Sequence, residues 1–413
     1  MNEWRAAVEE RFDEAREFLS SLVRFPSVSG GGETEIQDFV AERFGALGEV
    51  ETREVPEDLK RDPQYTFGDH EFDYSGRKNV VLRFPSKGAG RSLILNSHVD
   101  VVPAEHWKEA FSPRLEDGIL YGRGACDAKG QVATMYLALC ALRDSGVTLS
   151  GALTAQAVIE EEVGGNGTLA LIRQGYRADG VIVLEPTSLR IKAANRGAVW
   201  FALEVTGKPV HMGKIREGVN AIEKTCFLMD RMREYEKRLI EESRDYPLFE
   251  QFEQPVQVNF GVMRGEGWPS MVCGRAVLEG GVGFLPNKNL ELVKKELDAV
   301  VRDCGDDWIP EHYRLTFPRL HNDAYEIARD HPLARALEEA AATAGIEPAV
   351  EGWIVSCDAR LFSRVGEMPV VVFGPGAIED AHSNNEKLEL EQMKQAAAAL
   401  AEAIVRWCGR ENS

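Results

Sequence analysis

The chain is organised around the stretch LILNSHVDVVP, residues 93–103. Its first three residues are apolar and predict a strand that is buried on both faces of a sheet. His98 and Asp100 follow, so this strand would deliver polar atoms to the mouth of the sheet. Side chains two apart on an extended strand point the same way, and Asp100 could therefore fix the tautomer of His98 while the other ring nitrogen binds a metal. For an isolated His-x-Asp, the alternative is a solvated strand end.

Length and composition indicate a globular protein of two domains. The chain has 413 residues, of which 44% are hydrophobic and 28% charged. A net charge of -19 argues against nucleic acid or an anionic membrane surface as a partner, because both require a basic patch. No apolar run approaches the ~20 residues that span a bilayer, and residues 1–24 form a charged amphipathic pattern unlike a signal peptide. The seven scattered cysteines contain no C-x-x-C pair, which fits a reducing, cytoplasmic location.

A second polar residue lies in LYGRGACDAKG, residues 120–130. Asp127 stands at the junction between this glycine-rich turn and a helix predicted over 128–144, which is apolar nearly all round. As a structural residue Asp127 would be the N-cap of that helix. An N-cap and a metal ligand are compatible roles if one carboxylate oxygen serves each.

Further polar residues follow other apolar strands. The run Glu160–Glu162 comes directly after a strand predicted over 153–159, and Glu185 ends a strand predicted over 181–184. His382 lies much later, beyond a strand predicted over 370–373. Three adjacent carboxylates repel one another, so their place beside a core strand favours nearby cations. The alternative is a solvated charge run.

Together these strands predict one metal centre. In open α/β sheets, ligands gather at the carboxyl ends of strands. Five polar side chains should therefore converge there: His98, Asp127, Glu162, Glu185 and His382. Two imidazoles and three carboxylates suit two zinc ions with one bridging carboxylate, and a hydroxide would balance the remaining charge. Cobalt or manganese would also fit this ligand set.

These motifs resemble those of the dinuclear zinc aminoacylase, acetylornithine deacetylase, succinyl-diaminopimelate desuccinylase and carboxypeptidase G family, over nearly the whole chain. The resemblance implies an α/β fold with a mixed, largely parallel sheet flanked by helices, and an inserted α+β lid domain. It implies that His98 and Glu185 hold one metal, that Glu162 and His382 hold the other, and that Asp127 bridges the two.

The resemblance also assigns catalytic roles. Asp100 would orient His98, and Glu161 would be the general base that assists a metal-bound hydroxide in attacking an amide. His211, in the sequence GKPVH, would hydrogen-bond the tetrahedral intermediate, often in the partner's active site. Without the resemblance, His211 would be a solvated loop residue.

The middle of the chain predicts a separate domain. Strands and two helices alternate there without metal ligands, which is typical of an inserted α+β unit. We predict a catalytic domain over 1–194 and 320–413 and an inserted domain over 195–319. By resemblance, this inserted domain is the lid through which a homodimer forms.

Substrate contacts are implied by three residues. Arg360, in the sequence CDAR, matches a substrate-binding arginine and could pair bidentately with a carboxylate, although a surface salt bridge is an equal alternative. Arg196 and Gly374 are further candidates. The segment 281–286, GVGFLP, lacks an arginine that several relatives carry, so one carboxylate clamp is lost or moved.

The sequence therefore predicts a dizinc amidohydrolase that cleaves an N-acyl amino acid or a related small N-acyl compound, in the manner of an acetylornithine deacetylase. A dipeptidase or carboxypeptidase of the same fold is the nearest alternative. A metal-dependent amino-acid-binding protein without turnover is the second, and the presence of Glu161 argues against it.

Overall fold

The structure is a computed structural model that describes residues 3–66, 72–104, 106–318 and 320–411. It divides into two compact units. Unit 1 comprises residues 1–193, 327–351 and 357–413, and unit 2 comprises residues 194–326 and 352–356. The predicted inserted domain, 195–319, is shorter than unit 2, which begins at residue 194, continues to residue 326 and also includes residues 352–356. The predicted boundary residue 319 lies outside the described residues.

Unit 1 is built on a mixed sheet in the order β1-β2-β6-β3-β7-β16-β8. At its centre β3 runs parallel to β6 and β7, and β16 runs parallel to β7, whereas β1 and β2 are antiparallel. All four residues of β7 are buried, so both faces of the sheet are covered there. The strands are β1 Glu49–Glu54, β2 Lys78–Phe84, β3 Ser86–His98, β6 Leu149–Val158, β7 Gly180–Val183, β8 Ile191–Asn195 and β16 Val370–Val372, with β15 Val350–Trp353 paired to β8.

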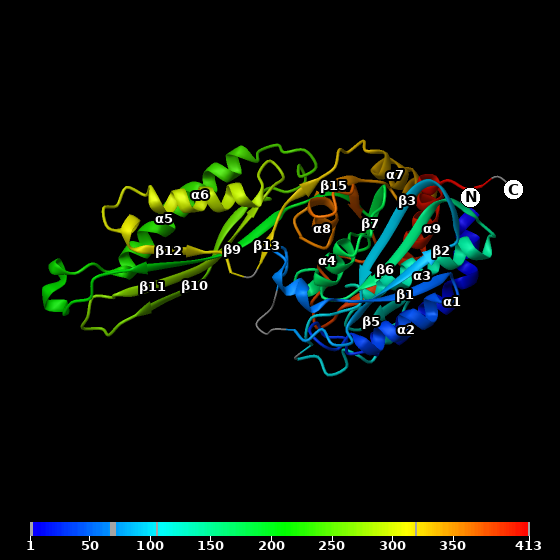
Figure 1. The fold of residues 1–413 in the computed structure, drawn as a ribbon, viewed down its shortest axis with the longest axis horizontal. Helices are drawn as coiled ribbons and strands as arrows, with labels where there is room; N and C mark the ends of the chain where they lie inside the picture. Colours follow the sequence, from blue (N-terminus) through cyan, green and yellow to red (C-terminus); the bar gives the residue numbers. More distant parts are fainter. Residues whose placement is uncertain (1–2, 67–71, 105, 319, 412–413) are drawn as a thin grey trace. The chain divides into compact units, whose positions relative to one another are not determined.

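Helices cover this sheet (Figure 1). The first fourteen residues of α3 are all buried, as expected for a helix that is apolar nearly all round. The helices of unit 1 are α1 Glu3–Val23, α2 Thr34–Phe44, α3 Lys129–Asp144, α4 Asn166–Arg173, α7 Pro332–Thr343, α8 Ala359–Arg364 and α9 Leu390–Cys408, with the 3-10 turns η1 Glu57–Arg61 and η2 Glu161–Val163. None of the helices in the described ranges is both long and apolar enough to cross a membrane.

A second, three-stranded sheet completes unit 1. Its order is β17-β5-β4, and all its pairs are antiparallel. The strands are β4 Arg114–Glu116, β5 Ile119–Tyr121 and β17 Lys387–Glu389. This small sheet leads directly into the turn that carries Asp127.

Unit 2 is an antiparallel sheet in the order β10-β11-β9-β12, to which β13 adds beside β9. Val199, Phe201, Leu203 and Val205 of β9 are buried, whereas the residues between them are partly exposed, so one face of the sheet is covered and the other is open. The elements are β9 Gly197–Thr206, η3 Met212–Glu217, α5 Ala221–Glu242, β10 Gln257–Glu266, β11 Arg275–Phe284, α6 Leu290–Arg302, η4 Ile309–Glu311, β12 Tyr313–Thr316, β13 His321–Asn322 and β14 Tyr325–Glu326. The predicted fold class, a mixed sheet with flanking helices and a separate α+β unit, is confirmed.

Candidate metal centre

Four of the five predicted ligands follow parallel strands of the main sheet. His98 is the last residue of β3, and Glu162, Glu185 and His382 lie in the segments after β6, β7 and β16. Since these strands are parallel, their carboxyl ends lie at one edge. Asp127 arrives differently, because it follows β5 of the small sheet.

The expectation that Asp127 caps the helix is wrong. Helix α3 begins at Lys129, its N-cap residue is Ala128, and no side chain caps it by a hydrogen bond. Instead, the backbone around Asp127 is held by Glu386, whose Oε1 accepts the N–H groups of Cys126 and Asp127, each at 2.9 Å. Both carboxylate oxygens of Asp127 thus remain for other partners.

The five residues form two groups that share Asp127. One group is His98, Asp127 and Glu185, and the other is Asp127, Glu162 and His382. Within each group, one potential ligand atom per residue lies within 4.8 Å of the others. Oδ1 of Asp127 is 3.1 Å from Nε2 of His98, and Oδ2 is 3.3 Å from Nε2 of His382. The geometry therefore presents one carboxylate between two imidazoles.

His98 is fixed through its other ring nitrogen. Nδ1 lies 3.0 Å from the carbonyl oxygen of Asp100 and 3.4 Å from its Oδ1. A proton on Nδ1 leaves Nε2 as the atom with a free lone pair, and Nε2 is the atom that faces Asp127. Asp100 also has a role that the sequence did not indicate: its Oδ1 and Oδ2 accept the backbone N–H groups of Glu161 and Glu162, each at 3.2 Å.

The three consecutive glutamates do not all face the same way. Glu160 has a left-handed backbone, with φ of 64°, and its fully buried carboxylate accepts hydrogen bonds from the Tyr74 hydroxyl at 2.6 Å and from Asn166 Nδ2 at 2.9 Å. It also pairs with Arg77, which in turn donates to Glu33 at 2.6 Å. Glu160 is therefore satisfied within the protein, and only Glu161 and Glu162 are left for the centre. The solvated charge run is excluded for Glu160.

Several carboxyl groups of the centre lie close together and are buried. Burial raises the pKa of Glu185 to about 7, and burial together with Asp127 raises that of Glu162 to about 7. Burial also opposes ionisation of Asp127, but the neighbouring imidazoles of His382 and His98 outweigh it and hold the pKa of Asp127 below its usual range. Oε1 of Glu185 is buried without a hydrogen-bond partner. Cations would relieve this charge and satisfy that oxygen, so the residues fit divalent metal ions.

Glu161 belongs to neither ligand group. Its Oε2 lies 4.0 Å from Nε2 of His98, and its side chain is 15% exposed. Burial, followed by the nearby charge of Glu185, raises the pKa of Glu161 well above its usual value. Glu161 is therefore a largely buried carboxyl group that lies beside the candidate ligands without belonging to either group.

The other predicted site residues lie in different surroundings. Arg360 is 4% exposed, so it is no surface salt bridge, and its Nη2 donates to the Gly164 carbonyl at 2.7 Å, just after the Glu161 turn. The N–H of Gly374 donates to Thr187 Oγ1 at 3.0 Å, and a Cβ on Gly374 would lie 2.6 Å from the carbonyl oxygen of Glu185. Arg196 and His211 belong to unit 2.

His211 lies on an exposed loop at the start of η3. Its Nδ1 accepts the N–H of Gly213 at 3.2 Å, which places the proton of a neutral ring on Nε2. Nε2 is therefore a hydrogen-bond donor.

The fold and the two candidate metal groups are typical of a two-unit α/β metallohydrolase, and comparisons with known proteins agree with the fold. The family model described as "Peptidase family M20/M25/M40" matches residues 94–406. This protein belongs to that family and is a hydrolase. Most of the chain is included in the match, and so are all five predicted metal ligands.

Curated relatives extend over most of the chain. An acetylornithine deacetylase of Myxococcus xanthus is 31% identical over 337 residues, 80% of this chain and 84% of the relative. The N-formyl-4-amino-5-aminomethyl-2-methylpyrimidine deformylase of Bacillus subtilis is 29% identical over 366 residues, 82% of this chain and 85% of the relative. Among solved structures, a tripeptidase from Staphylococcus aureus has a TM-score of 0.74 at 21% identity and covers 95% of this chain and 97% of its own. That last likeness concerns the fold alone.

Proposed function

We propose that this protein is a dizinc amidohydrolase that cleaves the amide bond of an N-acyl amino acid or a related small N-acyl compound. The observation that carries the proposal is the position of Glu161, 4.0 Å from His98 and outside both ligand groups. The names of the two curated relatives support it, since deacetylation and deformylation both remove an acyl group from nitrogen. A protein that only bound its ligand would not need this carboxylate.

Each ligand has a proposed role. His98 and Glu185 would hold one zinc ion, Glu162 and His382 the other, and Asp127 both. Bound zinc would polarise the amide carbonyl and lower the pKa of water to about 7. The residues present are not selective for zinc, and cobalt or manganese would be accepted as well.

The protein's own groups would then move the proton. Glu161 would accept a proton from the attacking water and pass it to the leaving amine, which typically contributes about 10²–10⁴-fold to the rate. Asp100 would hold the His98 ring through Nδ1, so that Nε2 faces the metal. His211 would donate a hydrogen bond from Nε2 to the oxyanion of the tetrahedral intermediate.

The variant His211→Asn tests the role of His211. It should lower kcat while the zinc content stays unchanged, and an unaltered kcat would contradict this role.

Arg360 and Gly374 are proposed to shape the substrate pocket. Arg360 already supports the turn of Glu161 through Gly164, and its guanidinium is proposed to pair with a substrate carboxylate beside that turn. Gly374 would act indirectly, because its N–H donates to Thr187 and its missing Cβ lets Gln131 and the backbone of Glu185 pack closely beside it.

We also propose a homodimer through unit 2. Large apolar side chains are exposed near His211: Met212 at 56%, Ile215 at 57%, Trp268 at 70% and Met271 at 47%. Exposed apolar surface of this kind marks interaction sites. Sedimentation of Trp268→Glu beside the unaltered protein tests this. If both proteins sediment as dimers, the proposed interface is wrong.

A cytoplasmic location is proposed because none of the seven cysteines forms a disulfide.

The test of function is amine release from a panel of N-acetyl, N-formyl and N-succinyl amino acids and of dipeptides, measured on zinc-loaded protein. Selective turnover of one N-acyl class is the expected result. Preference for dipeptides would favour the dipeptidase or carboxypeptidase alternative. No turnover of any compound, with zinc bound, would contradict the proposal and favour the binding protein.

A further inference from the structure

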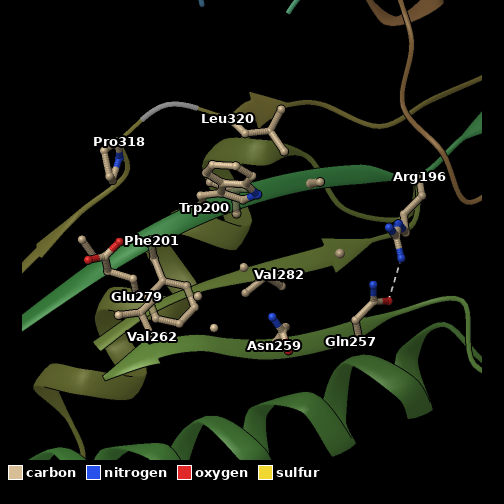
Figure 2. Close-up of a pocket in the computed structure, with 17 residues that line it drawn as sticks. Arg196, Trp200, Phe201, Gln257, Asn259, Val262, Glu279, Val282, Pro318 and Leu320 are labelled. Atoms are coloured by element: carbon tan, nitrogen blue, oxygen red, sulfur yellow. Dashed lines mark hydrogen bonds between the residues drawn. The ribbon is translucent and has the colours of Figure 1, made fainter. Parts of the chain in front are cut away.

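A hollow lies on the open face of the sheet in unit 2, opposite the face that is buried. Its volume is about 740 Å³, which is in the range of small-ligand pockets. Strands β9, β10 and β11 form its floor, and Pro318 and Leu320 stand at its rim (Figure 2). We call it the lid hollow. All residues that line it belong to unit 2.

Glycines line part of the floor of the lid hollow. Gly261, Gly281 and Gly283 line it from β10 and β11. A Cβ on Gly261 would contact only the ends of neighbouring groups, at 3.7 Å or more, so space and not crowding surrounds this residue. Glycine inside a strand weakens the strand and often marks a place where a ligand approaches the backbone. Gly261 thus leaves open floor, whereas Gly281 and Gly283 make room for the side chains of Trp200 and Arg196.

A guanidinium group lies at one end of the lid hollow. Arg196 extends from the start of β9 across β11 toward Gln257 of β10 (Figure 2), and its Nη1 donates to Gln257 Oε1 at 2.7 Å. It lies flat on Gly283, since a Cβ there would be 3.0–3.1 Å from the guanidinium atoms. Its Nε is buried without a hydrogen-bond partner. Within the described ranges no carboxylate pairs with Arg196, and burial lowers its pKa.

An aromatic wall stands beside this charge. The Trp200 side chain is 45% exposed and reaches over Gly281, whose Cβ would lie 3.3 Å from Cδ1 of the indole. Indole rings bind flat apolar groups by stacking. Glu279 also lines the lid hollow and is paired with Arg264, so the site carries little net positive charge and suits a monoanion better than a polyanion.

We propose that the lid hollow binds a small monocarboxylate that carries a flat apolar group. The carboxylate would pair with the Arg196 fork, which matches it bidentately, and the flat group would lie on the glycine floor against Trp200. The side-chain amides of Gln257 and Asn259 line the same space and would orient polar atoms between the two ends. This site goes beyond the proposed hydrolase centre, because its residues lie in unit 2 alone.

The test is calorimetric titration of the zinc-loaded, full-length protein with 3-phenylpropionate, and with 3-phenylpropanol as the matched neutral probe. The unaltered protein should bind the acid saturably and the alcohol at least about tenfold more weakly, since a hydrogen bond to a charged group typically contributes that much. Arg196→Met should weaken acid binding by about tenfold or more, and Arg196→Lys by less. Gly281→Val, which fills the floor, should weaken both probes.

Controls separate this site from the metal centre. Arg314→Gln removes an exposed arginine of the same sheet and should leave affinity unchanged. Carboxylates also bind metal ions. If acid binding survives in both Arg196→Met and Gly281→Val, and both variants are folded, the acid binds at the metal centre and the proposed site in the lid hollow is wrong. Equal affinity for the acid and the alcohol would also contradict the proposed site. So would the absence of acid binding in a protein that sedimentation shows to be a dimer, because a second copy would then cover this face.

Turnover on the same samples distinguishes the two proposals. Hydrolysis without acid binding contradicts only the carboxylate site in the lid hollow. Acid binding without hydrolysis of any amide contradicts only the proposed hydrolase function. If Arg196→Met loses acid binding and raises KM without changing kcat, the natural carboxylate is the substrate. If KM is unchanged while acid binding is lost, the ligand is a separate effector. Either result supports the site.

Discussion

The backbone N–H of Glu161 donates to Oδ1 of Asp100 at 3.2 Å. The same carboxylate lies 3.4 Å from Nδ1 of His98, so one buried side chain holds both the proposed base and a proposed metal ligand in place. A residue with two such contacts fixes the position of the base relative to the ligand.

Asp100→Asn should therefore impair the centre without removing a ligand. An amide cannot accept on both sides, so one of its contacts to His98, Glu161 or Glu162 would be lost. We expect zinc affinity or kcat to fall by about 10–100-fold, the usual effect of losing a partner of a metal ligand. Zinc titration and amide turnover check this. Asp117→Asn, in an exposed turn, is the control, and equal behaviour of the two variants would contradict the role of Asp100.

Asp127→Ala should reduce the metal content more than any other single change. Asp127 is the one residue shared by both ligand groups, with an oxygen 3.1 Å from His98 and another 3.3 Å from His382. We expect fewer than two bound zinc ions per chain by elemental analysis after dialysis. Glu109→Ala, an exposed carboxylate near by in sequence, should keep both. Retention of two ions by Asp127→Ala would show that Asp127 is no bridge.

Arg77→Met should strongly destabilise unit 1. Arg77 is 4% exposed and pairs with Glu33 and Glu160, which are 1% and 0% exposed. Removing the cation leaves two buried carboxylates without it, at a cost of about 3–5 kcal/mol in the free energy of unfolding. Arg83→Met breaks a pair in which the arginine is 53% exposed, and should cost about 1 kcal/mol or less. Urea unfolding measures both, and equal losses would refute the prediction.

Glu33 should make stability depend on pH. Burial raises the pKa of Glu33 from its usual 4.5 to about 7. The folded protein then holds this proton more tightly than the unfolded chain, so the contribution is complete below about pH 4.5 and is lost as the pH rises through about 7. Glu33→Gln cannot titrate, so the difference in unfolding free energy between the two proteins should change across this window, with a slope of at most about 1.4 kcal/mol for each pH unit. A difference that stays constant with pH contradicts this.

The grouping of the candidate metal-binding residues could be predicted from the sequence because these residues follow apolar strands. Parallel strands carry their carboxyl ends to one edge, so the residues after β3, β6, β7 and β16 had to meet there. The resemblance then supplied the division into two groups. Asp127 came from a second sheet, but its place before an apolar helix was enough to single it out.

Other features depend on contacts between distant residues, which no local pattern encodes. Glu160 turns away from the centre because its backbone is left-handed and because Arg77, far earlier in the chain, receives its carboxylate. The hold of Glu386 on the backbone of Asp127 has the same origin, since the partners are 259 positions apart. A buried arginine gives no periodic signal. The lid hollow was also missed, since its glycines come from two strands that meet only in the folded sheet.

We propose that Glu161 serves as the base of a metal centre that it does not help to bind. The most direct measurement is kcat for the best N-acyl substrate together with zinc content, on one preparation each of unaltered protein, Glu161→Gln and the exposed control Glu42→Gln. We predict that Glu161→Gln keeps its zinc while kcat falls by about 10²–10⁴-fold, and that Glu42→Gln matches the unaltered protein. Full activity of Glu161→Gln with zinc bound would contradict the role of Glu161 as the base.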